Sequence, residues 1–220
     1  MIKVFIKPWG DTVWQDWTDN LSGTIPDVQD KDVSSLVVFS LEFQDLDDSL
    51  INFETGWDLA VCEYDDDDNL IEICGNGKMF GKINSIEIIE AYGYSEYDED
   101  GLAFPKFKFR IGVEQRDFST IPFNLDYEGV KSASAIVTKI FEQYVRKELG
   151  GVLPSGNVVD RFEITCDDYD LLNFKNKGTS RRQLNEICSR ASWAWELIGI
   201  PEENETTLIS VLYKVRIWEE

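Results

Sequence analysis

The sequence of 220 residues contains no histidine. Ser-His and Cys-His nucleophile pairs, zinc sites with histidine ligands and imidazole proton transfer near neutral pH are therefore excluded. The four cysteines include no C-x-x-C pair, so the spacing gives little support to a zinc site. In a reducing compartment Cys62, Cys74, Cys166 and Cys188 are expected to be small buried apolar residues.

Long apolar runs are also missing. The longest, such as residues 36–39, fall far short of the roughly 18 residues that a membrane helix needs. The first residues, MIKVFIKPWGD, lack the apolar stretch and small-residue cleavage site of a signal peptide. We therefore expect the chain to be made and kept in a cytoplasm, unless an assembly carries it out.

Basic residues are few. Lys and Arg total 21 against 42 Asp and Glu, so the formal net charge is −21. Residues 1–118 hold 26 acidic and 9 basic residues, a balance of −17, and residues 119–220 account for the remaining −4. An acidic surface repels phosphate backbones, which predicts no binding to nucleic acid. Three interpretations of this charge remain open: it serves only solubility, it lets the surface stay near DNA without binding it, or it makes the surface imitate DNA.

The first half of the chain alternates with period two, which is typical of half-buried strands. Residues 37–44 and 106–113 alternate in this way, and a further strand is predicted near residues 83–92. Between them, pairing Tyr64 with Leu70 closes a five-residue hairpin loop. That register places Leu59, Val61, Ile71 and Ile73 on one core face and leaves Cys62 and Cys74 too far apart to bridge.

The second half changes to helical spacing. A helix is predicted from Ser132 to Leu149, with Gly150 and Gly151 as its stop. A second helix is predicted to begin at Ser180 with Gln183 completing a capping box. Strands are predicted at residues 161–166, from Trp193 to Leu197 and from Leu208 to Trp218, with both tryptophans on one face of their strand. The domain boundary falls near residue 118, without a flexible linker.

Several motifs that suggest chemistry fail on spacing. Residues 75–78, GNGK, lack the glycine and the Ser or Thr of a phosphate loop, and Phe80 occupies the place of the third glycine of a dinucleotide loop. A hairpin turn is the favoured interpretation. The acidic loop of Asp65, Asp66, Asp67 and Asp68 departs from an EF-hand because Leu70 stands where the turn glycine belongs. The acidic loop at residues 95–101 is a weaker candidate still.

The order of the pieces resembles the first barrel of phage tail hub proteins and the unit that follows it. Residues 36–43, then Gly56-Trp-Asp-Leu59, then Met79-Phe-Gly-Lys-Ile83, then residues 107–113 look like the four strands of that barrel. The usual Gly-Asp pair is shifted here by one residue. Residues 132–149 look like the family's first helix. Leu184, Ile187 and Trp195 are similar to its L-x-x-I-x-x-x-x-x-x-x-W signature, in which a helix leads into a tryptophan-bearing strand.

The resemblance covers about residues 33–218 and implies a structural role. Hubs of long-tailed phages, contractile injection systems and type VI secretion spikes form trimers whose two barrels per subunit make a pseudo-sixfold ring. Only one complete barrel is visible here, so the chain is either a minimal hub or the N-terminal portion of a longer tail protein. The implied partners are further copies of the chain as a homotrimer, a distal tail or tail tube protein, and a spike, fibre or other tail-tip protein. The implied location is the tail tip of a virion assembled in the host cytoplasm.

The sequence therefore predicts a mainly β fold with an α+β second half: an antiparallel β-barrel or sandwich at residues 1–118 and, at 119–220, two amphipathic helices with C-terminal strands. The predicted function is that of a structural protein in a tail-tip or baseplate hub and not an enzyme, with no catalytic, cofactor-binding or metal-binding residues and no cofactor. Two alternatives remain: an acidic DNA mimic that binds a nucleic-acid-binding protein, and a carbohydrate-binding or carbohydrate-active module. Seven tryptophans and 42 acidic residues leave the second one open.

Overall fold

The computed structural model describes residues 1–26, 35–45, 53–94, 105–145, 149–204 and 207–219. The fold is mainly β, and its two longer helices lie in the second half of the sequence, as predicted. Unit 1 comprises Met1–Gln29, Val37–Arg116 and Pro201–Ser210, and unit 2 comprises Asp30–Leu36, Asp117–Ile200 and Val211–Glu220. The break after Arg116 lies close to residue 118, whereas residues 201–210 join unit 1 and not the second domain to which the sequence analysis assigns them.

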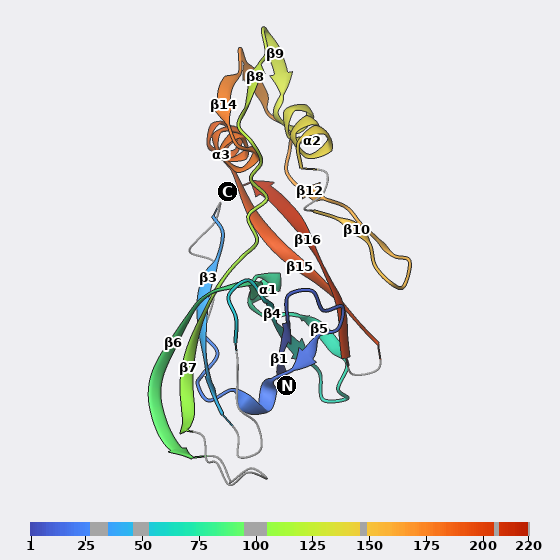
Figure 1. Ribbon diagram of the computed structural model, residues 1–220. Helices are drawn as coiled ribbons and strands as arrows, with labels where there is room; N and C mark the ends of the chain where they lie inside the picture. The colour runs from blue at the N-terminus through green and yellow to red at the C-terminus, as the bar shows by residue number, and fades with distance from the viewer. Residues whose placement is uncertain (27–34, 46–52, 95–104, 146–148, 205–206, 220) are drawn as a thin grey trace. The chain divides into compact units, whose positions relative to one another are not determined.

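Unit 1 contains a seven-stranded sheet with the order β2-β1-β4-β6-β7-β3, in which β5 pairs with β4. Figure 1 shows β6, β7 and β3 as long curved strands lying side by side. The elements are β1 (Ile2–Lys7), β2 (Gln15–Asp16), the short helix η1 (Thr18–Asn20), β3 (Val38–Gln44), β4 (Asp58–Tyr64), β5 (Leu70–Ile73), α1 (Cys74–Gly77), β6 (Phe80–Tyr94) and β7 (Pro105–Glu114).

One segment joins the two ends of this sheet. Its first residues form β2 and pair with β1. Leu21 then bridges Phe43 of β3, and the Ser22 N–H donates to the Glu42 carbonyl at 2.9 Å. Residues 15–22 therefore connect β1 to β3 and close the sheet into a barrel-like ring. Closure of this kind removes exposed strand edges, which would otherwise attract other chains.

The alternation predicted for residues 37–44 is confirmed. Phe39, Leu41 and Phe43 are buried, whereas Val38 is 63% exposed. Their partners across the ladder with β7 include Val113 and Ile111, which are fully buried, so both strands turn the same side to the core.

The predicted pairing of Tyr64 with Leu70 is confirmed, but the rest of the hairpin register is wrong. A bulge between Glu63 and Tyr64 shifts the ladder, so Cys62 pairs with Ile73. Because an extra residue on one strand reverses the side on which its side chains lie, Ile71 is 56% exposed and does not join the core face.

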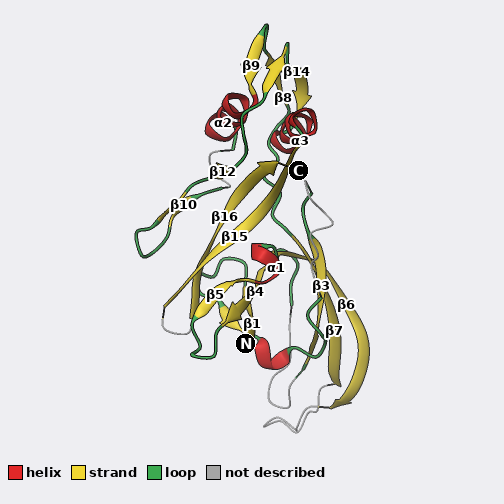
Figure 2. Cartoon of the chain, turned by 180° about the vertical axis from the view of Figure 1, so that it is seen from behind, coloured by secondary structure: helices red, strands yellow, loops and turns green. Residues whose placement is uncertain are grey.

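Unit 2 combines short strand pairs with two helices, which Figure 2 shows near β8, β9 and β14. β8 pairs with β14, β9 with β13 and β10 with β11, and β12, β16 and β15 form a three-stranded sheet in which β12 is parallel to β16. The elements are β8 (Phe123–Asp126), β9 (Val130–Ser132), α2 (Ala133–Gln143), β10 (Gly151–Val152), β11 (Val158–Val159), β12 (Phe162–Ile164), β13 (Asp170–Leu172), β14 (Lys175–Gly178), α3 (Ser180–Ala191), β15 (Trp193–Asn204) and β16 (Thr207–Glu219).

The first helix is shorter than predicted. Ser132 caps α2 by accepting the Ala135 N–H on its hydroxyl, but the helix ends at Gln143, and Tyr144 has a φ of −114°. The predicted helix to Leu149 is therefore wrong. Val145 and Leu149 are nevertheless buried, so these two positions in the apolar pattern are occupied by core residues outside the helix.

The predicted capping box of the second helix is also wrong. Thr179, one residue earlier, is the N-cap, and its hydroxyl accepts the Arg182 N–H at 3.4 Å. Ser180 is the first helical residue, and its hydroxyl lies 2.6 Å from that of Thr120. The Gln183 amide donates to the Phe123 and Asn176 carbonyls and so ties α3 to β8 and β14. None of the helices in the described part of the chain is long and apolar enough to cross a membrane.

Candidate functional site

Residues 75–78 form a tight turn between β5 and β6. Gly75, Asn76 and Gly77 have φ values of 67°, 55° and 87°, so α1 is a left-handed turn. The Lys78 N–H donates back to the Cys74 and Gly75 carbonyls, both at 3.2 Å. Phosphate and dinucleotide loops lead into a helix whose N-terminus faces the anion, whereas this turn leads into a strand. The turn is therefore confirmed, but the predicted hairpin is wrong, because β5 and β6 each pair with β4 and not with each other.

The acidic loop between β4 and β5 is organised from within. The Asp65 carboxylate accepts the N–H groups of Asp67 and Asn69 at 3.0 and 2.8 Å, and it also accepts the Asn69 side-chain amide. The Asn69 amide is the main reason that the pKa of Asp65 lies below its usual value. Asp68 lies 2.8 Å from the Lys3 ammonium. Asp66 and Asp67 remain exposed at the tip.

The residues that the structure describes contain no group of three or more carboxylates or thiols placed to hold a metal ion. All four cysteines are free; Cys62, Cys74 and Cys188 are buried, and Cys166 is partly exposed. Burial raises the pKa of Cys74 to about 11 and that of Cys188 to about 12. These thiols therefore stay protonated near neutral pH, and a protonated thiol is a poor nucleophile.

Two of the barrel segments that carry the family resemblance meet in unit 1. The Gly56 N–H donates to the Ile83 carbonyl at 2.7 Å, and the Ile83 N–H donates to the Trp57 carbonyl at 2.9 Å. The next residue, Asp58, pairs with Lys82 across the ladder, and their charged groups lie 3.1 Å apart. Gly56 has a φ of 91°, a conformation that favours glycine. The G-W-D-L and M-F-G-K-I segments thus form one local structure.

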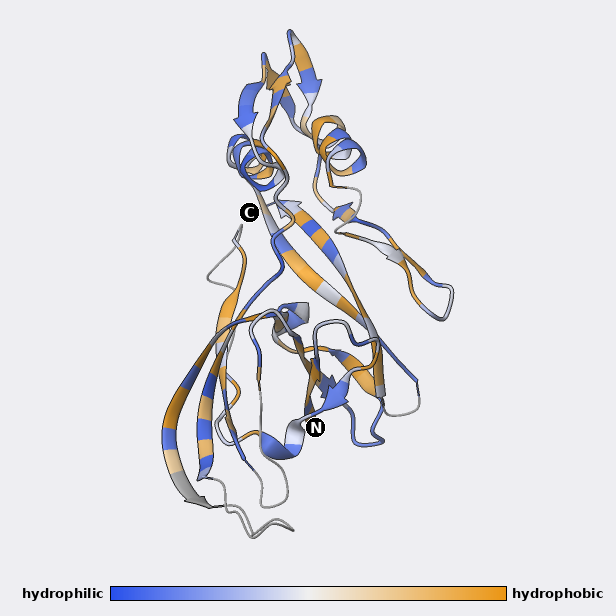
Figure 3. Ribbon diagram, viewed as in Figure 1, coloured by the Kyte–Doolittle hydropathy of each residue, from blue (hydrophilic) through white to orange (hydrophobic). Residues whose placement is uncertain are grey.

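The helix-to-tryptophan segment forms the centre of unit 2. Leu184 and Ile187 of α3 are fully buried, and the chain leaves the helix through Ser192 in a left-handed conformation with a φ of 56°. Trp195 in β15 is also fully buried, and its indole N–H donates to the Asn185 side chain at 2.6 Å. In Figure 3 the apolar colouring of β15 lies along the middle of the strand and not at its end next to α3.

Further aromatic residues surround this tryptophan. Phe118 packs edge-on against Trp195 with ring centroids 5.4 Å apart, and Phe141 of α2 lies 6.1 Å from Phe118. Phe162 stacks on Phe141 at 4.9 Å. Trp193 is also buried. Both tryptophans therefore pack inside unit 2.

The structure describes the exposed acidic positions of unit 1 only in part. Glu72 is exposed on β5, like Asp66 and Asp67 in the adjoining loop. The predicted acidic loop of Tyr97 and Asp100 lies outside the described residues.

Sequence reasoning missed one feature of unit 2, a hollow of about 550 Å³ lined by residues of α2, β10, β11 and the start of β12. Arg161 lies in it, and the Nε of its guanidinium is buried without a hydrogen-bond partner in the described part of the chain. The sequence around it carries no known motif; Gly150 and Gly151 mark only the expected end of a helix.

Comparison with known proteins adds no relative: no protein-family model, curated protein or solved structure matches this chain.

Proposed function

We propose that this chain is a structural component of a phage tail-tip or baseplate hub, in which copies of the chain form a symmetric ring that adapts the tail tube to the tip. The observation that carries the proposal is the segment from Leu184 to Trp195, where a capped helix turns sharply into a strand and the three signature positions are buried together. A family signature that depends on core packing requires this arrangement.

The order of the two units supports the same proposal. A closed antiparallel sheet precedes the helix-to-tryptophan segment, as the resemblance implies, and the two barrel motifs are joined by hydrogen bonds at Gly56 and Ile83. Closed symmetry is the usual state of homo-oligomers, so we propose a homotrimer. Its partners would be a distal tail or tube protein on one side and a spike, fibre or other tail-tip protein on the other.

The charge is compatible with this position. Hub rings surround the path along which DNA leaves the particle, and a wall that attracted phosphates would retain the DNA through counterion release. An acidic wall repels it. We propose that part of the excess charge of unit 1, including exposed groups such as Glu72, faces this path.

The test is the oligomeric state of the chain, alone and co-expressed with the tail proteins encoded beside it. We expect native mass spectrometry to report three copies of the 25.3-kDa chain, and negative-stain images to show a ring with threefold symmetry. Antibodies against the chain should label one end of the tail in intact particles. A monomer in assembled particles, or labelling confined to the capsid, would contradict the proposal.

A further inference from the structure

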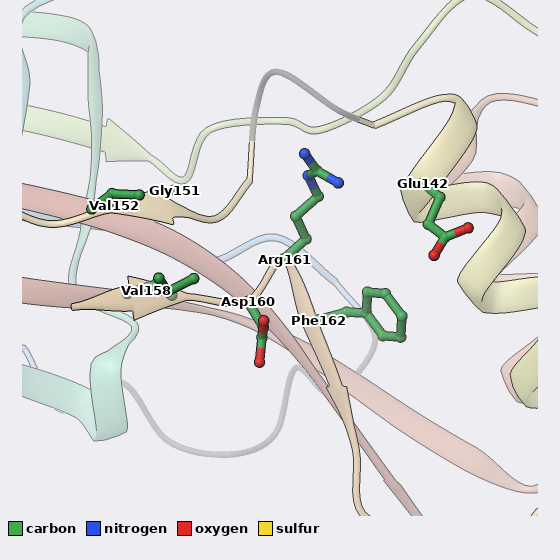
Figure 4. A pocket seen from close by; sticks show the side chains of 8 residues that line it. Glu142, Gly151, Val152, Val158, Asp160, Arg161 and Phe162 are labelled. Carbon is green, nitrogen blue, oxygen red and sulfur yellow. The ribbon is translucent and has the colours of Figure 1, made fainter. Parts of the chain in front are cut away.

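Among the described residues that line the hollow in unit 2, Arg161 is basic, Glu142 and Asp160 are acidic, and the others are apolar or glycine. Figure 4 shows the guanidinium of Arg161 projecting into the space between the β10–β11 hairpin and α2. Neighbouring side chains of an extended chain point to opposite sides, and the Asp160 carboxylate accordingly points away from the Arg161 guanidinium. Glu142 reaches the rim from α2. The side chain that projects into the hollow is therefore basic.

The backbone around Arg161 fits closely to its side chain. Gly150 has a φ of 67°, and a Cβ built on it would lie 2.7 Å from the Val159 carbonyl oxygen and 2.9 Å from the Arg161 Cγ. Only glycine fits there without displacing the arginine stem. Arg161 has no carboxylate partner among the described residues, and the same holds for Lys131, Lys139, Lys177 and Arg182. Five other basic residues of unit 2 are ion-paired: Lys175, Arg181, Arg190, Lys214 and Arg216.

An exposed apolar surface adjoins this cation. Val152 and Val158 face each other across the β10–β11 ladder and are 65% and 73% exposed. The surface therefore suits a ligand in which a carboxylate lies next to an aliphatic side chain. Arginine binds carboxylates through two parallel hydrogen bonds, and burying the exposed valine side chains against an aliphatic group lowers the free energy of the complex.

The chain itself carries a segment with this chemistry. At the β4–β5 loop, Asp66 and Asp67 are exposed, and Ile71 close by is 56% exposed. The hydrogen bonds to Asp65 hold the loop in shape before any contact forms, which lowers the entropy cost of binding. We propose that the Arg161 hollow of one copy binds the β4–β5 acidic loop of a second copy.

The contact is heterologous, because the hollow belongs to unit 2 and the loop to unit 1. Heterologous contacts close into rings or extend into filaments. The inference therefore rests on the proposed ring and assigns one of its contacts.

Direct binding tests the contact without the ring. The probe is a fluorescent cyclic peptide with the sequence of residues 64–71, YDDDDNLI. The receptor is the full chain carrying Asp66→Asn and Asp67→Asn, so that its own loops do not compete. We expect saturable binding in fluorescence anisotropy, weakened at least about tenfold by Arg161→Met, which keeps an apolar stem, and more by Arg161→Glu. Arg161→Lys should retain part of the affinity.

The matched control is Lys177→Glu, which makes the same charge change at an exposed residue of β14. It should leave binding unchanged. Circular dichroism spectra like those of the unmodified chain show that each variant is folded. If the receptor with Arg161 intact shows no saturable binding of the peptide, the inference is wrong. It is also wrong if Arg161→Glu and Lys177→Glu lower the affinity equally.

A charge swap in the full chain completes the test. Arg161→Glu alone, and Asp66→Arg with Asp67→Arg, should each lower the population of the oligomer in native mass spectrometry, and combining them in one chain should restore it. An oligomer unaffected by either change would overturn the inference and leave the hub proposal standing. If the chain binds the peptide but remains a monomer in the presence of its tail proteins, the proposed ring is wrong. The hollow is then a carboxylate-binding surface without a role in ring formation.

Discussion

Truncation of Trp195 to alanine tests whether the helix-to-tryptophan segment is the core of unit 2. The indole is fully buried, packs edge-on against Phe118 at 5.4 Å and donates to Asn185. Replacing a buried tryptophan or phenylalanine by alanine costs about 3–5 kcal/mol in lost transfer free energy and cavity formation. Asn185 is exposed and regains water on truncation. We therefore expect Trp195→Ala to lower the free energy of unfolding of unit 2 by about 3–5 kcal/mol.

The measurement is urea denaturation followed by far-UV circular dichroism, with two transitions fitted if the units unfold separately. Trp195→Phe keeps most of the apolar volume and removes the indole donor, so it should cost less than Trp195→Ala. Asn185→Ala should cost about 1 kcal/mol in the unmodified chain and almost nothing beside Trp195→Phe. Trp9→Ala is the control, because Trp9 is 83% exposed. If Trp195→Ala proves as harmless as Trp9→Ala and instead abolishes partner binding, Trp195 belongs to an interface and the packing argument is wrong.

Two further predictions concern the ends of α3 and the thiols. Thr179→Ala should destabilise unit 2 by about 1 kcal/mol in the same titration, because the Arg182 N–H loses its cap; a change below about 0.3 kcal/mol would contradict the cap assignment. Cys166 should be alkylated first by iodoacetamide at pH 8, because it is partly exposed, whereas burial raises the pKa of Cys188 to about 12. Peptide mass spectrometry of the native chain checks this order, and labelling of Cys62 before Cys166 would refute it.

Sequence patterns predict the elements of this fold well where one periodicity dominates. The alternation at residues 37–44 corresponds to β3, and Phe39, Leu41 and Phe43 all enter the core. The apolar spacing around Leu184 and Ile187 likewise predicts α3 and its buried face. In both cases burial follows directly from the period of the side chains.

The errors lie where tertiary contacts decide between local alternatives. Thr179 and Ser180 can both cap a helix, and contacts elsewhere decide between them, because the Ser180 hydroxyl lies beside Thr120. Ile71 is the extra residue of the bulge opposite Glu63 and Tyr64, and it is exposed although its residue type fits the core. An extra residue of this kind is invisible in composition, and it changes which residues face each other beyond it.

The Arg161 hollow could not be predicted for a related reason. It is lined by α2, the β10–β11 hairpin and the first residue of β12, and it depends on a glycine that accepts a positive φ. No local pattern encodes the meeting of three elements. An arginine without a partner is likewise visible only when its surroundings are known.

The net charge of −21 predicts how the self-association of the chain depends on salt concentration. Copies of so acidic a chain repel one another over distances comparable with the Debye length, about 30 Å at 0.01 M salt and about 8 Å at 0.15 M. A close contact between Arg161 and a carboxylate in a partly enclosed hollow is screened much less than this long-range repulsion. Raising the salt from 0.01 to 0.15 M should therefore strengthen self-association, as measured by sedimentation equilibrium, and Arg161→Glu should lower the association constant at both concentrations. If self-association instead falls steadily as the salt concentration rises, exposed ion pairs hold the copies together. The expectation that screening of the repulsion between copies outweighs screening of the Arg161 contact is then wrong.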